Sequence, residues 1–449
     1  MHQDLASRLV PPAPGPAGAA SAAHAINPRV PGIRSLHSPG PTRVPEAVMH
    51  AMQRPMMDLM DPRVGALIRA CEDGMRALLG TRDAPVLFYA ANGHGMWEAV
   101  TANLSARGRA LLIAGGGHFS DSWAMQTEIL GQATGTTVLR TPHAEGHPTD
   151  PAAIEQALRE DKAHRIAAVL VVHTDTSSGI TSDLAAVRRA IDAAAHPALY
   201  VVDLVASLAA APFDMDALGV DVAMGASQKG LMCPPGLGYV AVNARAMAFA
   251  EAHAGPRFYW DWVRRASDLQ YKKFCGTPPL AHLAGLEAAL QLIAEEGLAN
   301  VHARHARLGG AVHAALARWG MGEGAGALKA FCKVASARSA SVTAIEITSG
   351  HDPEALRTVA RERFQVAMAG GLGPLAGRVF RIGHLGDMNE ATILGALAGV
   401  EAAMVVQGIP FGEGGVAAAA RFLVDATAAR APAAAAAAAT AGDAAGTGA

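Results

Sequence analysis

The sequence predicts an α/β fold with a large domain built on a mostly parallel sheet of the seven-stranded type, followed by a smaller C-terminal α+β domain. Two observations predict it. Short apolar runs of strand length alternate with segments of helical spacing, and longer helical patterns take over from about residue 285. Strands that are apolar throughout and alternate with helices are typical of a parallel sheet covered on both faces. With 51% apolar and 17% charged residues, the chain can bury a large core.

The expected elements follow in chain order. In the first domain, strands are predicted at 85–89, 110–114, 167–173, 198–203 and 238–242, with helices at 151–158 and 183–195. In the second, helices are predicted at 281–296, 301–319 and 353–364, and strands at 341–347 and 379–383. We assign the large domain to 31–295 and the small domain to 296–425. The end segments 1–30 and 426–449 are expected to be disordered, because they are dominated by small residues and proline.

Composition excludes several classes of function. The formal net charge of −2 leaves no basic field for nucleic acid, and apolar runs of strand length predict no membrane partner. The four cysteines are scattered without a C-x-x-C pair, so we expect neither disulfides nor a metal site. No apolar stretch of signal-peptide length lies near the N-terminus, and we therefore expect a cytoplasmic setting.

The segment S-Q-K-G-L-M-C-P-P-G-L-G, Ser227–Gly238, places Lys229 in a tight connection before a strand. An amine attacks a carbonyl only when it is deprotonated, so a Schiff-base lysine must be partly desolvated or near another cation. The segment alone fits an ordinary surface lysine equally well.

Asp203 ends the apolar strand that precedes Lys229. A carboxylate at the carboxyl end of a parallel strand faces the crevice where α/β sheets bind ligands. Pyridoxal 5′-phosphate (PLP) needs such a group, because a carboxylate keeps its pyridine nitrogen protonated and electron-withdrawing. The alternative is an aspartate that caps the following helix.

Two glycine-rich turns follow strands. In N-G-H-G-M-W-E, Asn92–Glu98, the glycines free backbone N–H groups to point at a phosphate, and a helix begins there. A plain strand–helix connection is the alternative, and the absence of G-x-G-x-x-G disfavours a dinucleotide. In G-G-G-H-F-S, Gly115–Ser120, Phe119 is either a stacking partner for an aromatic cofactor or a core residue.

The segment F-R-I-G-H-L-G, Phe380–Gly386, sets Arg381 inside an apolar strand. A buried arginine must be paired, and a substrate carboxylate is a natural partner. Solvent or a nearby acid is the alternative.

These motifs together resemble the class V (fold type I) PLP-dependent aminotransferases, and within them the serine–glyoxylate and alanine–glyoxylate group. The resemblance runs from about Leu36 to Met404. Further motifs carry it, namely S-P-G-P-T at 38–42, H-F-S-D-S-W at 118–123, H-T-D-T-S-S-G at 173–179 and V-D-L-V-A-S-L at 202–208.

The resemblance implies a role for each residue around the cofactor ring. Lys229 would form the Schiff base and act as the catalytic base, and Asp203 would hold the pyridinium. Val205 and Phe119 would pack on the two faces of the ring, and Thr176 would lie near the ring hydroxyl.

It also implies the residues that bind phosphate and substrate. Gly93, His94 and Gln228 would form the phosphate cradle, which the hydroxyl of Thr277 from a second subunit would complete, so a homodimer or a higher homo-oligomer is expected. Arg381 would bind the substrate carboxylate, and Gly40 would edge the substrate pocket.

Two positions depart from the family pattern. Phe274 stands where some relatives place a phosphate-binding tyrosine. The loop T-D-T-S-S, Thr174–Ser178, replaces the usual small residue and glutamate.

The implied activity is transfer of an amino group from a small amino acid, similar to serine or alanine, to a small 2-oxo acid such as glyoxylate or pyruvate. The two half-reactions would give ping-pong kinetics. The alternatives are an unusual amine donor, a PLP-dependent lyase or desulfurase of the same fold, and a PLP-binding regulator or inactive paralogue. A desulfurase needs a cysteine on a mobile loop, and neither Cys275 nor Cys332 lies in such a motif.

Overall fold

The computed structural model describes residues 32–253, 255–322 and 325–428. Disorder was expected for 1–30 and 426–449, and of these residues 1–30 and 429–449 lie outside the described ranges. The first residues of the expected C-terminal tail belong instead to helix α14 (Gly415–Ala428), because their alanine-rich sequence continues the helical pattern.

The first sheet has seven strands, as predicted. Their order is β2 (Val86–Tyr89), β10 (Gly238–Val242), β9 (Val222–Ala226), β8 (Leu199–Asp203), β5 (Ile166–Val172), β3 (Ala110–Ala114) and β4 (Thr137–Arg140). Strand β10 runs antiparallel to both of its neighbours, and the other pairings are parallel. The carboxyl ends of the parallel strands therefore meet at one edge of the sheet, as the position of Asp203 requires.

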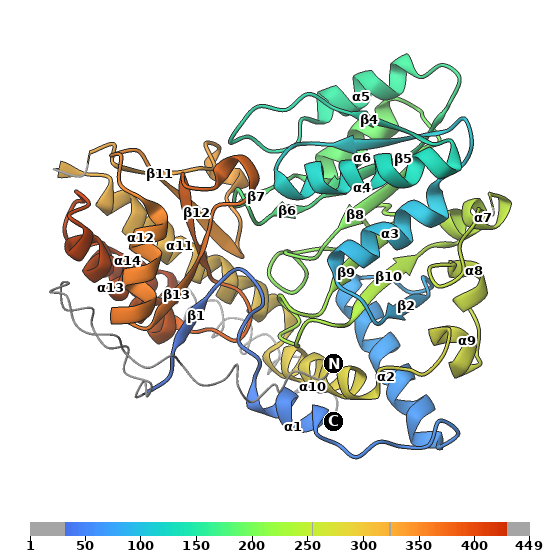
Figure 1. The fold of residues 1–449 in the computed structure, drawn as a ribbon, viewed down its shortest axis with the longest axis horizontal. Helices are drawn as coiled ribbons and strands as arrows, with labels where there is room; N and C mark the ends of the chain where they lie inside the picture. The colour runs from blue at the N-terminus through green and yellow to red at the C-terminus, as the bar shows by residue number, and fades with distance from the viewer. Residues whose placement is uncertain (1–31, 254, 323–324, 429–449) are drawn as a thin grey trace, which may run out of the picture. The chain divides into compact units, whose positions relative to one another are not determined.

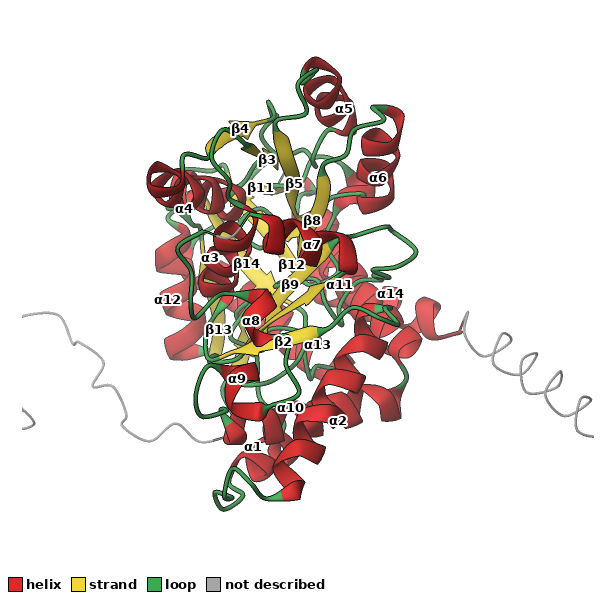
Figure 2. Ribbon diagram, turned by 90° about the vertical axis from the view of Figure 1, so that its right-hand side faces the viewer, coloured by secondary structure: helices red, strands yellow, loops and turns green. Residues whose placement is uncertain are grey.

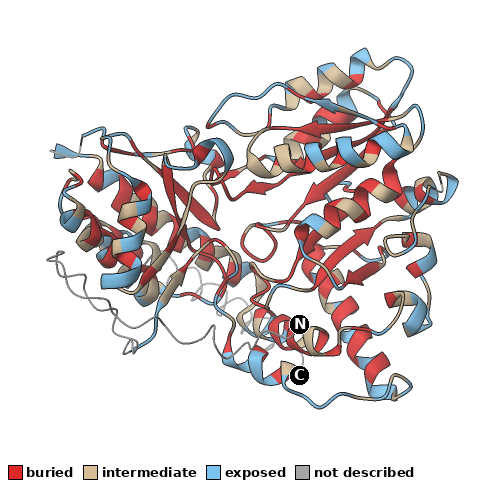
Figure 3. Ribbon diagram, viewed as in Figure 1, coloured by how far each residue is buried: buried red, intermediate tan, exposed pale blue. Residues whose placement is uncertain are grey.

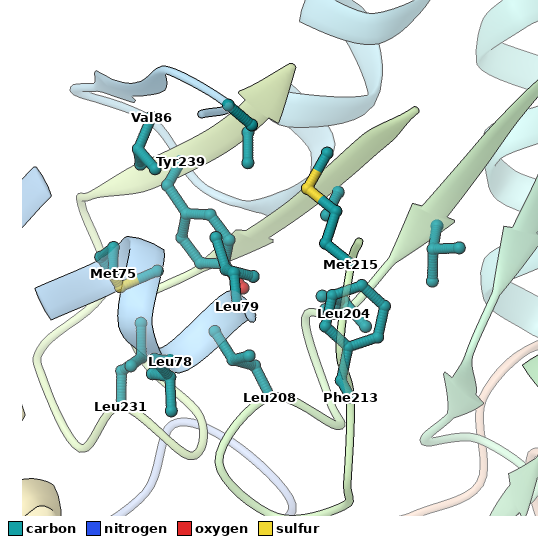
Figure 4. Packing of buried hydrophobic residues seen from close by; sticks show 14 of the residues in the cluster. Met75, Leu78, Leu79, Val86, Leu204, Leu208, Phe213, Met215, Leu231 and Tyr239 are labelled. Carbon is teal, nitrogen blue, oxygen red and sulfur yellow. The ribbon is translucent and has the colours of Figure 1, made fainter. Parts of the chain in front are cut away.

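Both faces of this sheet are covered by helices, which accounts for its almost wholly apolar strands (Figures 2 and 3). One face packs against α3 (Gly93–Leu104), α4 (His118–Thr134) and α7 (Ala244–Ala252). The other packs against α2 (Pro62–Leu79), α5 (Pro151–Glu160), α6 (Leu184–Ala193) and α10 (Leu280–Glu296). In Figure 4, side chains of α2 lie near Val86 and Tyr239 in this second layer.

Local sequence signals explain where several helices begin. Helices α2, α5 and α12 (Pro353–Arg363) each start with an Asp-Pro pair, in which the aspartate side chain accepts a backbone N–H and proline occupies the first position. Helix α3 begins after Asn92, whose side chain accepts the Gly95 N–H. These caps fix the entry of the chain into each helix.

The second sheet has five strands, in the order β1 (Ser35–His37), β13 (Val366–Gly370), β14 (Val379–Gly383), β12 (Val342–Ile347) and β11 (Leu328–Ala330). Its core lies against α11 (Leu298–Trp319), α12, α13 (Glu390–Gln407) and α14 (Figure 1). Both sheets lie in one compact unit that begins at Ser35. Strand β1 falls within our predicted first domain but pairs in parallel with β13 of the second sheet.

Helix α13 is long and apolar enough to cross a membrane by length and composition alone. Its buried residues, including Ile393, Leu397 and Val400, pack in the core of the second sheet. That packing accounts for its apolar character.

Candidate active site

Lys229 lies in the tight connection between β9 and β10. Ser227 ties this connection together, because its N–H donates to Leu237 at 2.9 Å and its hydroxyl donates to the Pro234 carbonyl at 2.6 Å. The Lys229 amine donates to the Pro39 carbonyl at 2.5 Å. A Cβ on Gly40, which has a φ of +126°, would lie 2.3 Å from that amine, so only glycine fits there.

The surroundings of Lys229 favour its neutral form. Burial is the main cause that lowers its pKa to about 8, the nearby Arg381 lowers it further, and Asp203 opposes both. An amine with this pKa is partly unprotonated near neutral pH, as a nucleophile that attacks a carbonyl must be.

Asp203 ends β8 and is 3% exposed. One carboxylate oxygen accepts the Val205 N–H at 2.7 Å, and the other accepts the indole N–H of Trp97 at 2.7 Å. Burial raises the pKa of Asp203 to about 6, while these two hydrogen bonds favour its ionised form. Asp203 therefore also caps the turn that follows β8, because its side chain accepts the Val205 N–H. This resembles the capping role that was the alternative interpretation of the residue.

Trp97 is a site residue that the sequence reasoning missed. The motif N-G-H-G-M-W-E was noted for its glycines alone, although Trp97 lies one helical turn after Gly93 and so faces the same side of α3. A buried tryptophan N–H usually has a partner, and this signal could have directed attention to a nearby acceptor.

The residues expected on the two faces of the ring come from separate loops. Val205 packs close to Gly93, where an added Cβ would lie 3.1 Å from a Val205 methyl carbon. Phe119, at the start of α4, is partly buried and meets Trp97 edge-on, with 6.2 Å between ring centroids. Both side chains border the hydrophobic cluster that contains Trp97.

The departure at Asp175 has a structural explanation. Its buried carboxylate accepts the N–H of Phe119 at 2.9 Å and that of Ser177 at 2.8 Å, and also the Ser177 hydroxyl. A Cβ on Gly117 would lie 2.4 Å from one of its oxygens. Asp175 therefore ties its loop to the start of α4, a role that the sequence reasoning did not anticipate.

Arg381 lies buried on β14, with 5% exposure. Its Nε donates to the Gly370 carbonyl at 2.6 Å and its Nη1 to the Thr176 carbonyl at 2.7 Å. Among the described residues it forms no ion pair. Burial is the main cause that lowers its pKa to about 10. Thr176 thus meets Arg381 through its backbone, and its hydroxyl has no partner in the described part of the chain.

The residues expected to form the phosphate cradle lie in two segments. Gly93 is buried at the start of α3, and His94 is exposed there, with its ring centroid 4.5 Å from that of Trp97. The Gln228 carbonyl accepts the Thr42 N–H at 3.1 Å, and the side-chain oxygen of Gln228 is buried with no hydrogen-bond partner among the described residues. Thr277 is exposed between α9 (Gln270–Phe274) and α10, and nothing in the described chain joins it to the other site residues.

Phe274 is a core residue. It is 4% exposed and packs in the core on the α2 and α10 face of the first sheet. Its ring fills apolar space, so this departure leaves the packing of the segment intact.

A cavity of about 230 Å³ is lined by residues that neighbour several site residues in the sequence, although Arg381 itself does not line it. Its walls include Gly117 and His118, which precede Phe119, and Ser177 and Ser178, which follow Thr176. Leu372, two residues after Gly370, also lines it. The two carbonyls that hold Arg381 therefore continue directly into the walls of this cavity.

These residues fit PLP. The site offers a lysine amine with a lowered pKa, a buried carboxylate held by two N–H donors, and a glycine-rich helix start to receive a phosphate. Lys229, Asp203, Val205, Phe119, Thr176, Gly93, His94 and Gln228 are the residues that would hold the cofactor.

Comparisons with known proteins agree with this geometry. The family model described as Aminotransferase class-V matches residues 35–375. The serine–glyoxylate aminotransferase of Methylorubrum extorquens is 40% identical, over 90% of this chain and 99% of that protein. The L-aspartate–glyoxylate aminotransferase of Paracoccus denitrificans is 39% identical, over 87% of this chain and 96% of that protein.

A solved structure has the same fold. The ureidoglycine–glyoxylate aminotransferase of Bacillus subtilis superposes with a TM-score of 0.77 at 25% identity, covering 88% of this chain and 99% of that one. This confirms the predicted fold type I architecture. The chain is a PLP-dependent transaminase and belongs to the class V aminotransferases.

Proposed function

We propose that this transaminase moves an amino group from a small amino acid, similar to serine or alanine, to glyoxylate or a similar 2-oxo acid such as pyruvate. The observation that carries the proposal is the buried guanidinium of Arg381, which forms no ion pair among the described residues and lies near enough to Lys229 to lower its pKa. A substrate carboxylate bound there would lie close to the reactive amine. The names of the two relatives support glyoxylate as the acceptor.

Each residue has a defined task in this reaction. PLP, when bound, supplies a protonated ring that withdraws electrons from the substrate α-carbon. Asp203 holds the ring nitrogen protonated, and Arg381 fixes the substrate through its carboxylate. The Lys229 amine would remove the α-proton as a base and later donate a proton as an acid. The Pro39 carbonyl and Gly40 limit the positions that this amine can take.

The test is a set of single half-reactions with the purified holoenzyme. Serine, alanine and aspartate are each mixed with the enzyme without an acceptor, and then glyoxylate or pyruvate is added. We expect one equivalent of 2-oxo acid from the donor, followed by one equivalent of glycine or alanine from the acceptor. Release of ammonia without a new amino acid would contradict the proposal and favour a lyase. Cysteine is tested in the same way, and release of its sulfur would favour a desulfurase.

The cysteines give no support to a desulfurase. The Cys332 thiol is buried and donates to the Val334 carbonyl at 3.2 Å, and burial raises its pKa. A raised pKa opposes the thiolate that a sulfur acceptor requires. Cys275 lies at the end of α9, with its thiol directed to the Phe258 carbonyl.

We propose a homodimer in which Thr277 reaches the phosphate of the second subunit. Its hydroxyl is exposed, and the preceding segment carries the exposed apolar side chains of Phe258, Leu269 and Tyr271. Apolar side chains near a site residue are consistent with a surface that a second copy covers. Sedimentation at micromolar protein should show no active monomer, and an active monomer would contradict this assembly.

We also propose a reducing, cytoplasmic setting. All four cysteines are free thiols, and three of them are buried.

A further inference from the structure

The carboxylate of Asp203 depends on a donor from another element. Its first oxygen is held by the N–H of Val205, two residues along the chain, at 2.7 Å. Its second oxygen is held by the indole N–H of Trp97 on α3, also at 2.7 Å. A local turn provides the first bond, whereas the second exists only because α3 is packed on the sheet.

The Trp97 ring is fixed before any ligand binds. It is 2% exposed and lies parallel to the ring of Trp123, with 5.8 Å between centroids and 11° between planes. His94 and Phe119 contact its other sides. A ring held from several sides cannot turn away, so its N–H stays directed at Asp203.

We propose that Trp97 is a positioning residue that keeps Asp203 ionised and oriented for the cofactor ring nitrogen. A carboxylate can hold a pyridinium only as the anion. Two hydrogen bonds to the ionised form also fix the direction in which its remaining lone pairs point.

The charges around Asp203 make this donor necessary. Burial and the nearby Asp175 both disfavour the anion, whereas Lys229 favours it. Burial raises the pKa of the nearby Tyr239, and the charge of Asp203 raises it further. The pKa of Asp203 is about 6, so it lies only a little below neutral pH, and a small further rise would protonate much of the carboxylate. A hydrogen bond to a charged group corresponds to a pKa change of about one to two units, which exceeds this margin.

The chain offers a matched control. Trp123 is also fully buried and belongs to the same cluster, but its indole N–H has no partner among the described residues. Trp97→Phe and Trp123→Phe therefore remove the same atoms from neighbouring rings. They differ in whether a hydrogen bond to Asp203 is lost.

The experiment measures the Kd of pyridoxamine 5′-phosphate for the cofactor-free, full-length chain between pH 5.5 and 9. This probe forms no bond to Lys229, so the titration of the lysine does not dominate the result. For Trp97→Phe we expect the acid midpoint of binding to rise by about one to two pH units, with affinity about two- to tenfold weaker at pH 7 and nearly restored at pH 9. For Trp123→Phe the midpoint should stay unchanged.

Two outcomes would overturn the proposal. One is an unchanged midpoint in Trp97→Phe, and the other is an equal shift in Trp123→Phe, which would indicate a packing effect. If Trp97→Phe does not fold, ¹⁵N NMR of the wild-type chain decides. The Trp97 indole signal should move with a midpoint near the pKa of about 6 of Asp203, while that of Trp123 stays constant. A Trp97 signal that does not titrate would refute the proposal. The inference rests on the cofactor and not on the proposed substrates, so either can fail without the other.

Discussion

Replacing Arg381 by lysine tests how the site recognises its substrates. The guanidinium has five N–H groups, of which the Gly370 and Thr176 carbonyls take two. The remaining edge can donate two parallel hydrogen bonds to a carboxylate, a geometry that a lysine amine does not reproduce. The alternative partner for Arg381 was a nearby acid, of which Asp387 is an example. The described residues contain no such ion pair, and Asp387 is exposed.

The magnitude follows from the bonds that would be lost. A hydrogen bond to a charged group contributes about 1.5–3 kcal/mol, and about 1.4 kcal/mol corresponds to a factor of ten. We therefore expect Arg381→Lys to lower kcat/KM for serine and alanine by about one to two orders of magnitude. A stability loss of about 1–3 kcal/mol should accompany it, because a backbone carbonyl loses its buried donor.

The assay compares each amino acid with its decarboxylated amine, ethanolamine for serine and ethylamine for alanine. The amines never used the guanidinium, so their low rates should be nearly unaffected, and the absorption of the bound cofactor should stay intact. Melting temperature is measured in parallel to isolate the structural part. Equal losses for an amino acid and its amine would refute a carboxylate-binding role.

Three further predictions concern the neighbouring residues. The rate of PLP uptake by the cofactor-free enzyme, measured by stopped-flow absorbance, should increase with pH with a midpoint near 8. Burial lowers the pKa of Lys229 from 10.5 to about 8, and only the neutral amine attacks. A midpoint near 10.5 would show that the amine is not desolvated. Gly40→Ala should nearly abolish amino transfer while the chain stays folded, because its Cβ would lie 2.3 Å from the Lys229 amine, and a wild-type steady-state rate would contradict this steric argument. Asp175→Asn should lower stability by about 1–3 kcal/mol in calorimetry, since the amide NH2 would then face one of the two N–H donors, that of Phe119 or that of Ser177. Unchanged melting would mean that the loop is held by other contacts.

The sequence predicted those parts of the fold and site whose signals are local. The strands 110–114, 238–242 and 379–383 have the predicted bounds, because each is a continuous apolar run between turns. Lys229 in its tight connection and Arg381 in its apolar strand could be read from their flanking residues. Their proposed roles remain predictions, to be tested as above.

Features that depend on distant parts of the chain could not be predicted in this way. Strand β4 was missed because it lies at the sheet edge and is mostly exposed, so it lacks an apolar run. Strand β9 was missed because its small residues, V-A-M-G-A, have weak strand preference and are held by pairing with β8 and β10. The bond from Trp97 to Asp203 joins residues far apart in sequence, and only the packing of α3 on the sheet brings them together.

The segment that follows β1 explains how a site divided between two sheets keeps its geometry. The His37 Nδ1–H donates to the carbonyl of Gly383, the last residue of β14, at 3.1 Å. The Ser38 carbonyl is so close to Gly383 that a Cβ added there would lie 2.6 Å from it. Directly afterwards, the Pro39 carbonyl receives the Lys229 amine, and the Thr42 hydroxyl donates to the Lys229 carbonyl at 3.0 Å. Burial lowers the pKa of His37 to about 4, so this contact keeps a neutral ring throughout the neutral pH range. One short segment therefore contacts the strand that carries Arg381 and the lysine that would move the proton. A shift of this segment would change the distance between the arginine and the lysine although neither residue is itself substituted. Small substitutions in this segment should therefore alter kcat more than cofactor binding.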